Sequence, residues 1–287
     1  MDPTAELTLR LGFFGGVLGA MMLWEWVAPR RPLSLSRAVR WTQNLALVAL
    51  NSLVVRLLFP AAAVGLAALA SDRGWGLLNG AALPPAVSIP VSVLALDLVI
   101  YLQHVMFHAV PVLWRVHRVH HADVDFDVTT GLRFHPIEIV LSMLVKFAAI
   151  LVLGPPAIAV LVFEVILNAT AMFNHGNVRI PGGIDRWLRW FVVTPDMHRV
   201  HHSIEDHEAN SNFGFSSPWW DRLLGTYRGQ PKAGHEGMTI GLRTYREPRQ
   251  VAWLAGMLAF PFAGQVAGTA INRRRSQEHD PNGGKHG

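Results

Sequence analysis

The chain alternates between long apolar segments and shorter polar segments rich in arginine or histidine. About 20 apolar residues in a helix are enough to cross a hydrocarbon core of about 30 Å. Five runs approach or reach that length: residues 11–27, 45–70, 87–108, 137–153 and 157–172. The second run contains Arg56 and Pro60, and an arginine at that depth is expected to face other helices or to extend toward the interface. The pattern predicts an all-α, polytopic membrane bundle of about four to five membrane helices or hairpins.

The polar segments predict how this bundle is oriented. Arginines at positions 30, 31, 37 and 40 follow the first apolar run and are expected to face the cytoplasm, which places the N-terminus outside. Gly154-Pro155-Pro156 separates the last two long runs and predicts a helical hairpin. With this topology, the histidine-rich segments all lie on the cytoplasmic side. We therefore expect an integral membrane protein whose cytosolic cap is helical and rich in histidine.

Composition agrees with a membrane protein and limits the chemistry. Charged residues make up 16% of the chain, against about 25% in a typical soluble domain. The net charge of +5 comes from arginines placed between apolar segments, so we interpret them as membrane anchors and expect no nucleic-acid partner. The chain has no cysteine. Any metal site must use histidine, carboxylate or water.

The peptide HRVHH occurs twice, at residues 117–121 and 198–202. Histidines at positions i, i+3 and i+4 share one face of a helix, so two or three imidazoles of each copy can bind one centre or two adjacent centres. The segment HVMFH precedes the first copy, and on a helix its two histidines share a face with Asp97 and Tyr101. The histidines of the three segments are His104, His108, His117, His120, His121, His198, His201 and His202.

Eight imidazoles are too many for one ion, because zinc takes four ligands, whereas two ions with about four ligands each fit the count. Imidazole suits iron, copper and zinc, and a site beside lipid tails favours oxidation over hydrolysis. A zinc hydrolase is expected to carry H-E-x-x-H, which is absent, and a haem protein with paired axial histidines would not need eight. The alternative that stays open is a histidine-rich membrane metal transporter or metal-binding protein without oxidase chemistry. It predicts histidines across the membrane or at its midplane.

Several motifs in the same order resemble the sterol desaturase/fatty acid hydroxylase superfamily. They are the three histidine segments, LDLVIYLQH, VLWRVHRVHH, FHPIE, FNHGN, TPDMHRVHHS and NSNFGFSSPWWDRLLGTYR. The resemblance implies a membrane oxygenase with two iron ions, which uses O2 and two electrons to hydroxylate or desaturate unactivated C–H bonds of a sterol, fatty acyl or related lipid. It also implies an external electron donor of the ferredoxin or cytochrome type, and a lipid substrate that enters from the bilayer.

By residue matching, the resemblance makes the eight histidines metal ligands and adds His175 of FNHGN as a ninth. His135 is predicted to be structural or to hydrogen-bond to a ligand. Asp97 and Asp196 are predicted to accept hydrogen bonds from ligand N–H groups. Glu164 is expected to hydrogen-bond within the bundle. Trp219 and Trp220 are assigned to packing.

The predicted domain organisation has four parts. Residues 1–88 form N-terminal transmembrane helices and loops, and residues 89–230 form a fatty acid hydroxylase-type catalytic domain. Residues 231–271 form a C-terminal interfacial or membrane segment, because the apolar run at 251–266 is short for a span and is broken by Pro261. Residues 272–287 are polar and are predicted to be a disordered tail.

Overall fold

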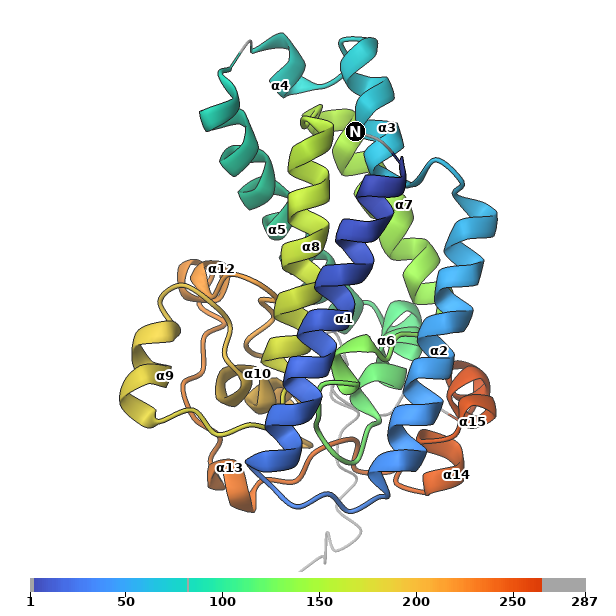
Figure 1. The fold of residues 1–287 in the computed structure, drawn as a ribbon. Helices are drawn as coiled ribbons and strands as arrows, with labels where there is room; N and C mark the ends of the chain where they lie inside the picture. Colours follow the sequence, from blue (N-terminus) through green and yellow to red (C-terminus); the bar gives the residue numbers. More distant parts are fainter. Residues whose placement is uncertain (1–2, 82, 265–287) are drawn as a thin grey trace, which may run out of the picture.

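The computed structural model describes residues 3–81 and 83–264, so the predicted tail at 272–287 lies outside the described residues. The described residues form helices and loops without a named strand, arranged as a long bundle above a cap of short helices (Figure 1). The bundle helices are α1 (Pro3–Val27), α2 (Arg37–Leu58), α3 (Ala62–Asp72), α4 (Leu77–Gly80), α5 (Pro85–Ala109), α7 (Pro136–Leu153) and α8 (Ala157–Asn174). The cap contains α6 (Pro111–His121), η1 (Thr130–Leu132), α9 (Gly182–Leu188), α10 (Pro195–His201), α11 (Asp206–Ala209), α12 (Trp219–Leu223), α13 (Gly234–Gly237), α14 (Pro248–Val251), α15 (Leu254–Ala259) and η2 (Phe260–Phe262).

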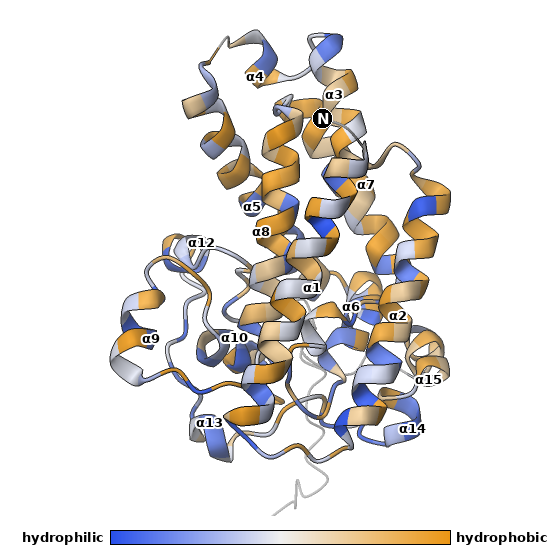
Figure 2. Ribbon diagram, viewed as in Figure 1, coloured by the Kyte–Doolittle hydropathy of each residue, from blue (hydrophilic) through white to orange (hydrophobic). Residues whose placement is uncertain are grey.

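Five segments of the described chain are long and apolar enough to cross a membrane. They are Thr4–Val27, Arg37–Gly80, Pro85–Ala109, Pro136–Leu153 and Ala157–Asn174. The predicted polytopic helical bundle is therefore confirmed. The second segment breaks between α2 and α3 at Pro60, which has no amide proton to continue a helix. Figure 2 shows apolar residues along the bundle helices and a more polar cap.

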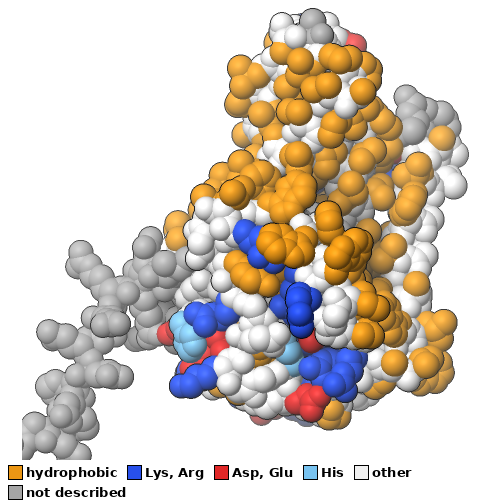
Figure 3. All heavy atoms as spheres, turned by 90° about the vertical axis from the view of Figure 1, so that its left-hand side faces the viewer, with side chains coloured by type: hydrophobic (Ala, Val, Ile, Leu, Met, Phe, Trp, Pro, Cys, Tyr) orange, Lys and Arg blue, Asp and Glu red, His pale blue; other side chains and the backbone are white. Residues whose placement is uncertain are grey.

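The surface divides in the same way. Large apolar side chains of the bundle are exposed, among them Leu11, Leu57 and Val152, as expected of helices that face lipid. In Figure 3, hydrophobic side chains cover the upper part of the face shown, while charged side chains gather on its lower part. Trp187 and Trp190 are exposed on or beside α9 in the cap. Tryptophans of this kind are enriched where a membrane meets water.

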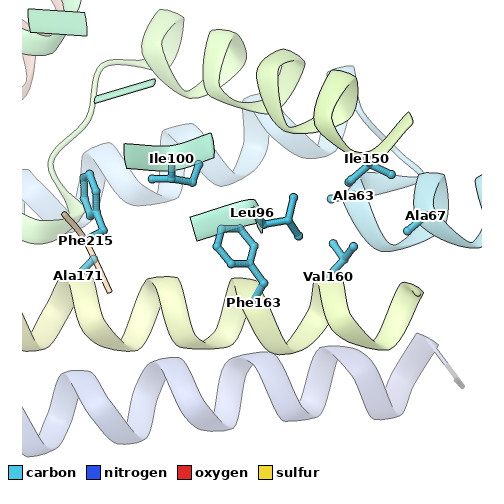
Figure 4. Packing of buried hydrophobic residues seen from close by; sticks show 9 residues of the cluster. All are labelled: Ala63, Ala67, Leu96, Ile100, Ile150, Val160, Phe163, Ala171 and Phe215. Atoms are coloured by element: carbon cyan, nitrogen blue, oxygen red, sulfur yellow. The ribbon is translucent and has the colours of Figure 1, made fainter. Parts of the chain in front are cut away.

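Small and branched residues set the packing of the bundle. Ala63 and Ala67 of α3 are fully buried against α7 and α8, and such small side chains let helices approach closely. These two alanines belong to a buried hydrophobic cluster, within which Leu96 of α5 packs against Phe163 of α8 (Figure 4). Helices α1 and α8 run parallel through the bundle (Figure 1), so both descend toward the cap.

The C-terminal apolar run folds into short helices against the cap. Val251, Met257 and Phe260 are buried in one cluster with Trp114 of α6 and Leu47 of α2. This run does not form a single span within the described residues, as its length predicts. Its contact with lipid stays a prediction.

A buried charge network attaches the cap to the bundle. Arg40 is among the arginines interpreted as membrane anchors, but its side chain is 1% exposed and pairs with Asp123 and Asp127. The physical reason is that the cap buries three aspartates close together, the third being Asp125, and buried carboxylates require a cation. Glu25 of α1 completes the attachment by accepting hydrogen bonds from two cap amides, each at 2.7 Å.

Candidate metal centre

The nine candidate ligands meet where the bundle joins the cap. His104 and His108 lie in the last turns of α5, and the first HRVHH ends α6. His175 follows α8 as its C-terminal cap, and the second HRVHH forms the end of α10. Every one of the nine side chains is at most 3% exposed. Helical spacing thus places four chain segments around one buried volume.

The nine histidines form two groups. The first, here the five-histidine group, is His104, His108, His117, His121 and His201. The second, here the four-histidine group, is His120, His175, His198 and His202. Within each group, one ligand atom from every residue lies within 4.8 Å of all the others.

Each HRVHH copy divides its imidazoles between the two groups, in opposite ways. The first copy gives its i and i+4 histidines to the five-histidine group and His120 to the other. The second copy gives its i and i+4 histidines to the four-histidine group and His201 to the other. The duplicated peptide therefore bridges two centres from two sides.

Hydrogen bonds fix which ring nitrogen faces the centre. His104 Nδ1 lies 2.7 Å from the carbonyl oxygen of Phe213, and His201 Nδ1 lies 2.7 Å from that of Ser211. A carbonyl only accepts, so Nδ1 carries the proton in both rings and Nε2 presents a lone pair. The two Nε2 atoms are nevertheless 3.0 Å apart. Facing lone pairs at this distance repel unless a cation lies between them.

In the four-histidine group, His175 shows the same arrangement. His175 Nδ1 lies 2.7 Å from the carbonyl oxygen of Ala171, while its Nε2 lies 3.2 Å from Nε2 of both His120 and His202. Neither nitrogen of His198 has a hydrogen-bond partner among the described residues. Converging unprotonated nitrogens with protonated outer nitrogens are the donor set of a metal site, so the residues of both groups fit metal ions.

Burial keeps these imidazoles neutral, which metal binding requires. Loss of hydration lowers the pKa of His117 and of His175 to about 3. The same cause, reinforced by neighbouring imidazoles, holds the pKa well below 6.5 for His120, His121, His198, His201 and His202.

Sequence reasoning did not assign a role to Glu138. This residue of the first turn of α7 is buried, and its Oε1 lies 2.6 Å from His117 Nδ1. A carboxylate in that position orients the ring and raises the basicity of Nε2. Glu138 is the last residue of the FHPIE segment, in which only His135 was predicted to have a role near the metal. His135 accepts a hydrogen bond from the Ile137 amide at 3.1 Å and caps α7, so it has a structural role outside both groups.

The two aspartates predicted to support ligands contact other residues. Asp97 Oδ2 accepts hydrogen bonds from Trp220 Nε1 at 2.9 Å and from the Ser217 amide at 3.3 Å. Asp196 pairs with Arg199 and, at 3.4 Å, with Arg30. Asp97 is held by a tryptophan and a backbone amide, and Asp196 is held by two arginines. Spacing along the chain could not predict these partners.

Asp221 supports a ligand instead, through the backbone. Its carboxylate accepts hydrogen bonds from the amides of Phe213 and Gly214 at 2.8 and 2.9 Å, and Phe213 supplies the carbonyl that meets His104. Asp221 belongs to the WWDRLLGTYR motif, in which only the two tryptophans had been assigned a role, that of packing.

The arginine and valine shared by the HRVHH copies also have a place in the structure. Val119 and Val200 are fully buried. Arg118 donates to the carbonyl of Phe260 at 2.9 Å, and Arg199 donates to that of Gly176 at 3.2 Å. Arg118 thus ties α6 to η2, and Arg199 ties α10 to the loop that follows α8.

A family model for fatty acid hydroxylases matches residues 89–226, which include all nine histidines. The chain belongs to the sterol desaturase/fatty acid hydroxylase superfamily. The sequence resemblance predicted this membership from an eight-histidine signature. All eight of those histidines lie in the two groups.

Curated members of the superfamily share this part of the chain. Alkylglycerol monooxygenase from Xenopus tropicalis is 29% identical over 163 residues, which are 55% of this chain and 34% of that protein. Ornithine lipid hydroxylase OlsE from Rhizobium tropici is 29% identical over 149 residues, 52% of this chain and 44% of that protein. Very-long-chain aldehyde decarbonylase GL1-1 from Oryza sativa subsp. indica is 32% identical over 155 residues, 50% of this chain and 24% of that protein. The chain thus spans less than half the length of these relatives. No solved structure matches it.

In this superfamily member, a cavity of about 860 Å³ leads from the histidines into the bundle. Its inner end is lined by His104 and His117 of the five-histidine group, with Phe134 and Phe215 beside them. Apolar side chains of α1, α2, α5, α7 and α8 line much of the remainder. Its size is that of a site for a molecule much larger than O2.

Proposed function

We propose that this protein is a di-iron membrane oxygenase that hydroxylates or desaturates an unactivated C–H bond of a lipid. The observation that carries the proposal is the cavity that ends at two histidines of the five-histidine group. Two relatives, an alkylglycerol monooxygenase and an ornithine lipid hydroxylase, support a lipid substrate.

In this proposal the nine histidines hold two iron ions, one at each group. Bound iron supplies the activation of O2 and the oxidation of the C–H bond. The protein holds the Nδ1 protons of His104 and His201 on backbone carbonyls, which keeps Nε2 available and fixes the ring planes. It also buries both groups, so water has little access to them. Two electrons come from an external donor of the ferredoxin or cytochrome type, which docks on the cytoplasmic side.

A metal transporter fits the structure less well. Transport sites lie at or across the membrane midplane. Here all nine histidines gather at one end of the bundle, and no histidine from elsewhere joins them among the described residues. A closed double cluster of this kind retains metal rather than passing it on.

The direct test is lipid oxidation by the full-length protein. Protein purified from iron-replete cells is given reductant, an electron donor, bilayer lipid extract and isotopically labelled O2, and the lipids are analysed by mass spectrometry. Labelled oxygen in a lipid, or loss of two hydrogens from one, is the expected result.

His201→Ala is expected to abolish this oxidation because it removes a predicted ligand. His207→Ala is the matched control, since that side chain is 53% exposed and lies outside both groups. Iron-loaded protein that leaves every lipid unchanged would refute the proposed activity, and full activity in His201→Ala would refute the ligand assignment.

A further inference from the structure

Charged residues line the end of the cavity away from the histidines. Arg10 of α1, Arg56 of α2 and Lys146 of α7 all line the cavity, and so does Glu164 of α8. All four belong to segments able to cross a membrane. Ionisable residues at membrane depth are costly and usually serve a function. We call Arg10, Arg56 and Lys146 the distal cation cluster.

Glu164 is shared by two of these cations, which confirms that it is bonded within the bundle. Its Oε2 lies 2.7 Å from Arg10 Nη2, and its Oε1 lies 2.5 Å from Lys146 Nζ. Arg10 also contacts Glu6 at 2.8 Å. These two carboxylates balance Arg10 and Lys146, and they tie α1, α7 and α8 together.

Arg56 is the one member of the distal cation cluster that Glu6 and Glu164 do not neutralise. It is exposed and has no ion pair with another described residue, and it lines the same cavity. Phe59, the C-cap residue of α2, contacts Phe147 of α7 with ring centroids 5.2 Å apart, which holds the Arg56 region of α2 next to the Lys146 region of α7. Ion pairing within the bundle does not account for this third cation, and an anionic ligand in the cavity would give it a partner.

The distance from this cluster to the metal centre follows from helix geometry. Glu164 precedes His175 by 11 residues along α8, which at 1.5 Å per residue is roughly 16 Å. The parallel helix α1 gives a similar separation, because Arg10 pairs with Glu164 while Met21, 11 residues later, packs in one cluster with Met172 and Val178, which flank His175. An extended alkyl chain with bonds of about 1.5 Å covers that distance with about a dozen carbons.

We propose that the distal cation cluster binds the anionic headgroup, a carboxylate or phosphate, of the lipid substrate. The alkyl chain then runs through the apolar part of the cavity toward His104 and His117. The inference rests on the proposed function and adds a substrate class to it. It also predicts the position of oxidation. The distance between the cluster and the metal centre places the oxidised carbon about a dozen positions from the headgroup.

Arg56→Gln tests the headgroup site without disturbing a charge pair. Full-length protein, stripped of metal by a chelator, is dialysed against labelled stearate, octadecyl phosphate or octadecanol. We expect the anionic ligand that matches the site to bind at least about tenfold more tightly than the alcohol, with Arg56→Gln removing that preference. Preference for the carboxylate or for the phosphate identifies the headgroup. Arg73→Gln is the matched control, because Arg73 is exposed and does not line the cavity.

Equal binding of all three ligands, or an equal loss of all three in Arg56→Gln, would overturn the inference. The proposed function is judged separately. Lipid oxidation without any preference for anionic ligands refutes only the headgroup site, and Arg56-dependent binding without oxidation refutes only the activity. In active protein, lengthening the substrate at its methyl end should leave the oxidised position unchanged when counted from the headgroup. An oxidised position that stays constant when counted from the methyl end would contradict this predicted distance.

Discussion

Replacing Glu138 with glutamine is expected to weaken metal binding at one group and leave the other intact. The carboxylate contacts His117 at 2.6 Å, and its second oxygen is buried without a hydrogen-bond partner among the described residues. Glutamine has nearly the same shape but lacks the charge that stabilises the protonated Nδ1. Loss of such a partner usually lowers metal affinity by about 10- to 100-fold, which corresponds to roughly 1.4–2.7 kcal/mol.

The assay is iron release against increasing chelator, followed by metal analysis of the remaining protein. Wild-type protein is expected to hold both ions to higher chelator concentrations, whereas Glu138→Gln should release about half of its iron early. Glu205→Gln is the control, because the Glu205 side chain is exposed and pairs with Arg243 rather than with a histidine. Release curves that coincide for Glu138→Gln and wild type, or a variant that loses both ions together, would refute the reasoning.

Three further predictions concern the surroundings of the groups. Gly131→Ala should reduce bound iron, because an added Cβ would lie 2.9 Å from His175 Nδ1 and closer still to a backbone carbonyl, and unchanged iron content would contradict this. Arg40→Met should destabilise the protein by about 3–5 kcal/mol, since it leaves Asp123 buried without its main partner, whereas Arg243→Met at an exposed pair should cost less than about 1 kcal/mol; denaturant unfolding compares the two. Acid should lower the thermal stability of the metal-free protein. Folding holds the pKa of the buried histidines well below 6.5, so these histidines take up protons on unfolding once the pH falls below 6.5. The stability that is present above that pH is therefore lost. A melting temperature that does not change below pH 6.5 would contradict it.

The sequence allowed prediction of the helical bundle and of the residues that gather at its end. Apolar runs predicted the five spans because their length is set by the membrane, and helical spacing predicted that each HRVHH directs its histidines to one side. It could not predict that His120 and His201 cross over to the opposite groups from their neighbours. That division depends on how α6 and α10 dock against each other, which is a long-range property.

The supporting carboxylates show the same limit. Asp97 is near His104 in sequence but contacts Trp220, whereas Glu138 contacts His117 from a different helix. Asp97 shares a face of α5 with His104, but side chains two turns apart on one helix reach different neighbours, so proximity along the chain did not identify the carboxylate that contacts a ligand. The buried Arg40 has a similar origin, since its aspartate partners lie more than 80 residues away.

The metal content of purified protein tests the central claim most directly. Protein from iron-replete cells should contain about two irons per chain without haem absorption, and His198→Ala, which removes a ligand from the four-histidine group alone, should fall toward one. One iron per chain in the wild type, a haem spectrum, or no loss of iron in His198→Ala would contradict two histidine-bound metal centres.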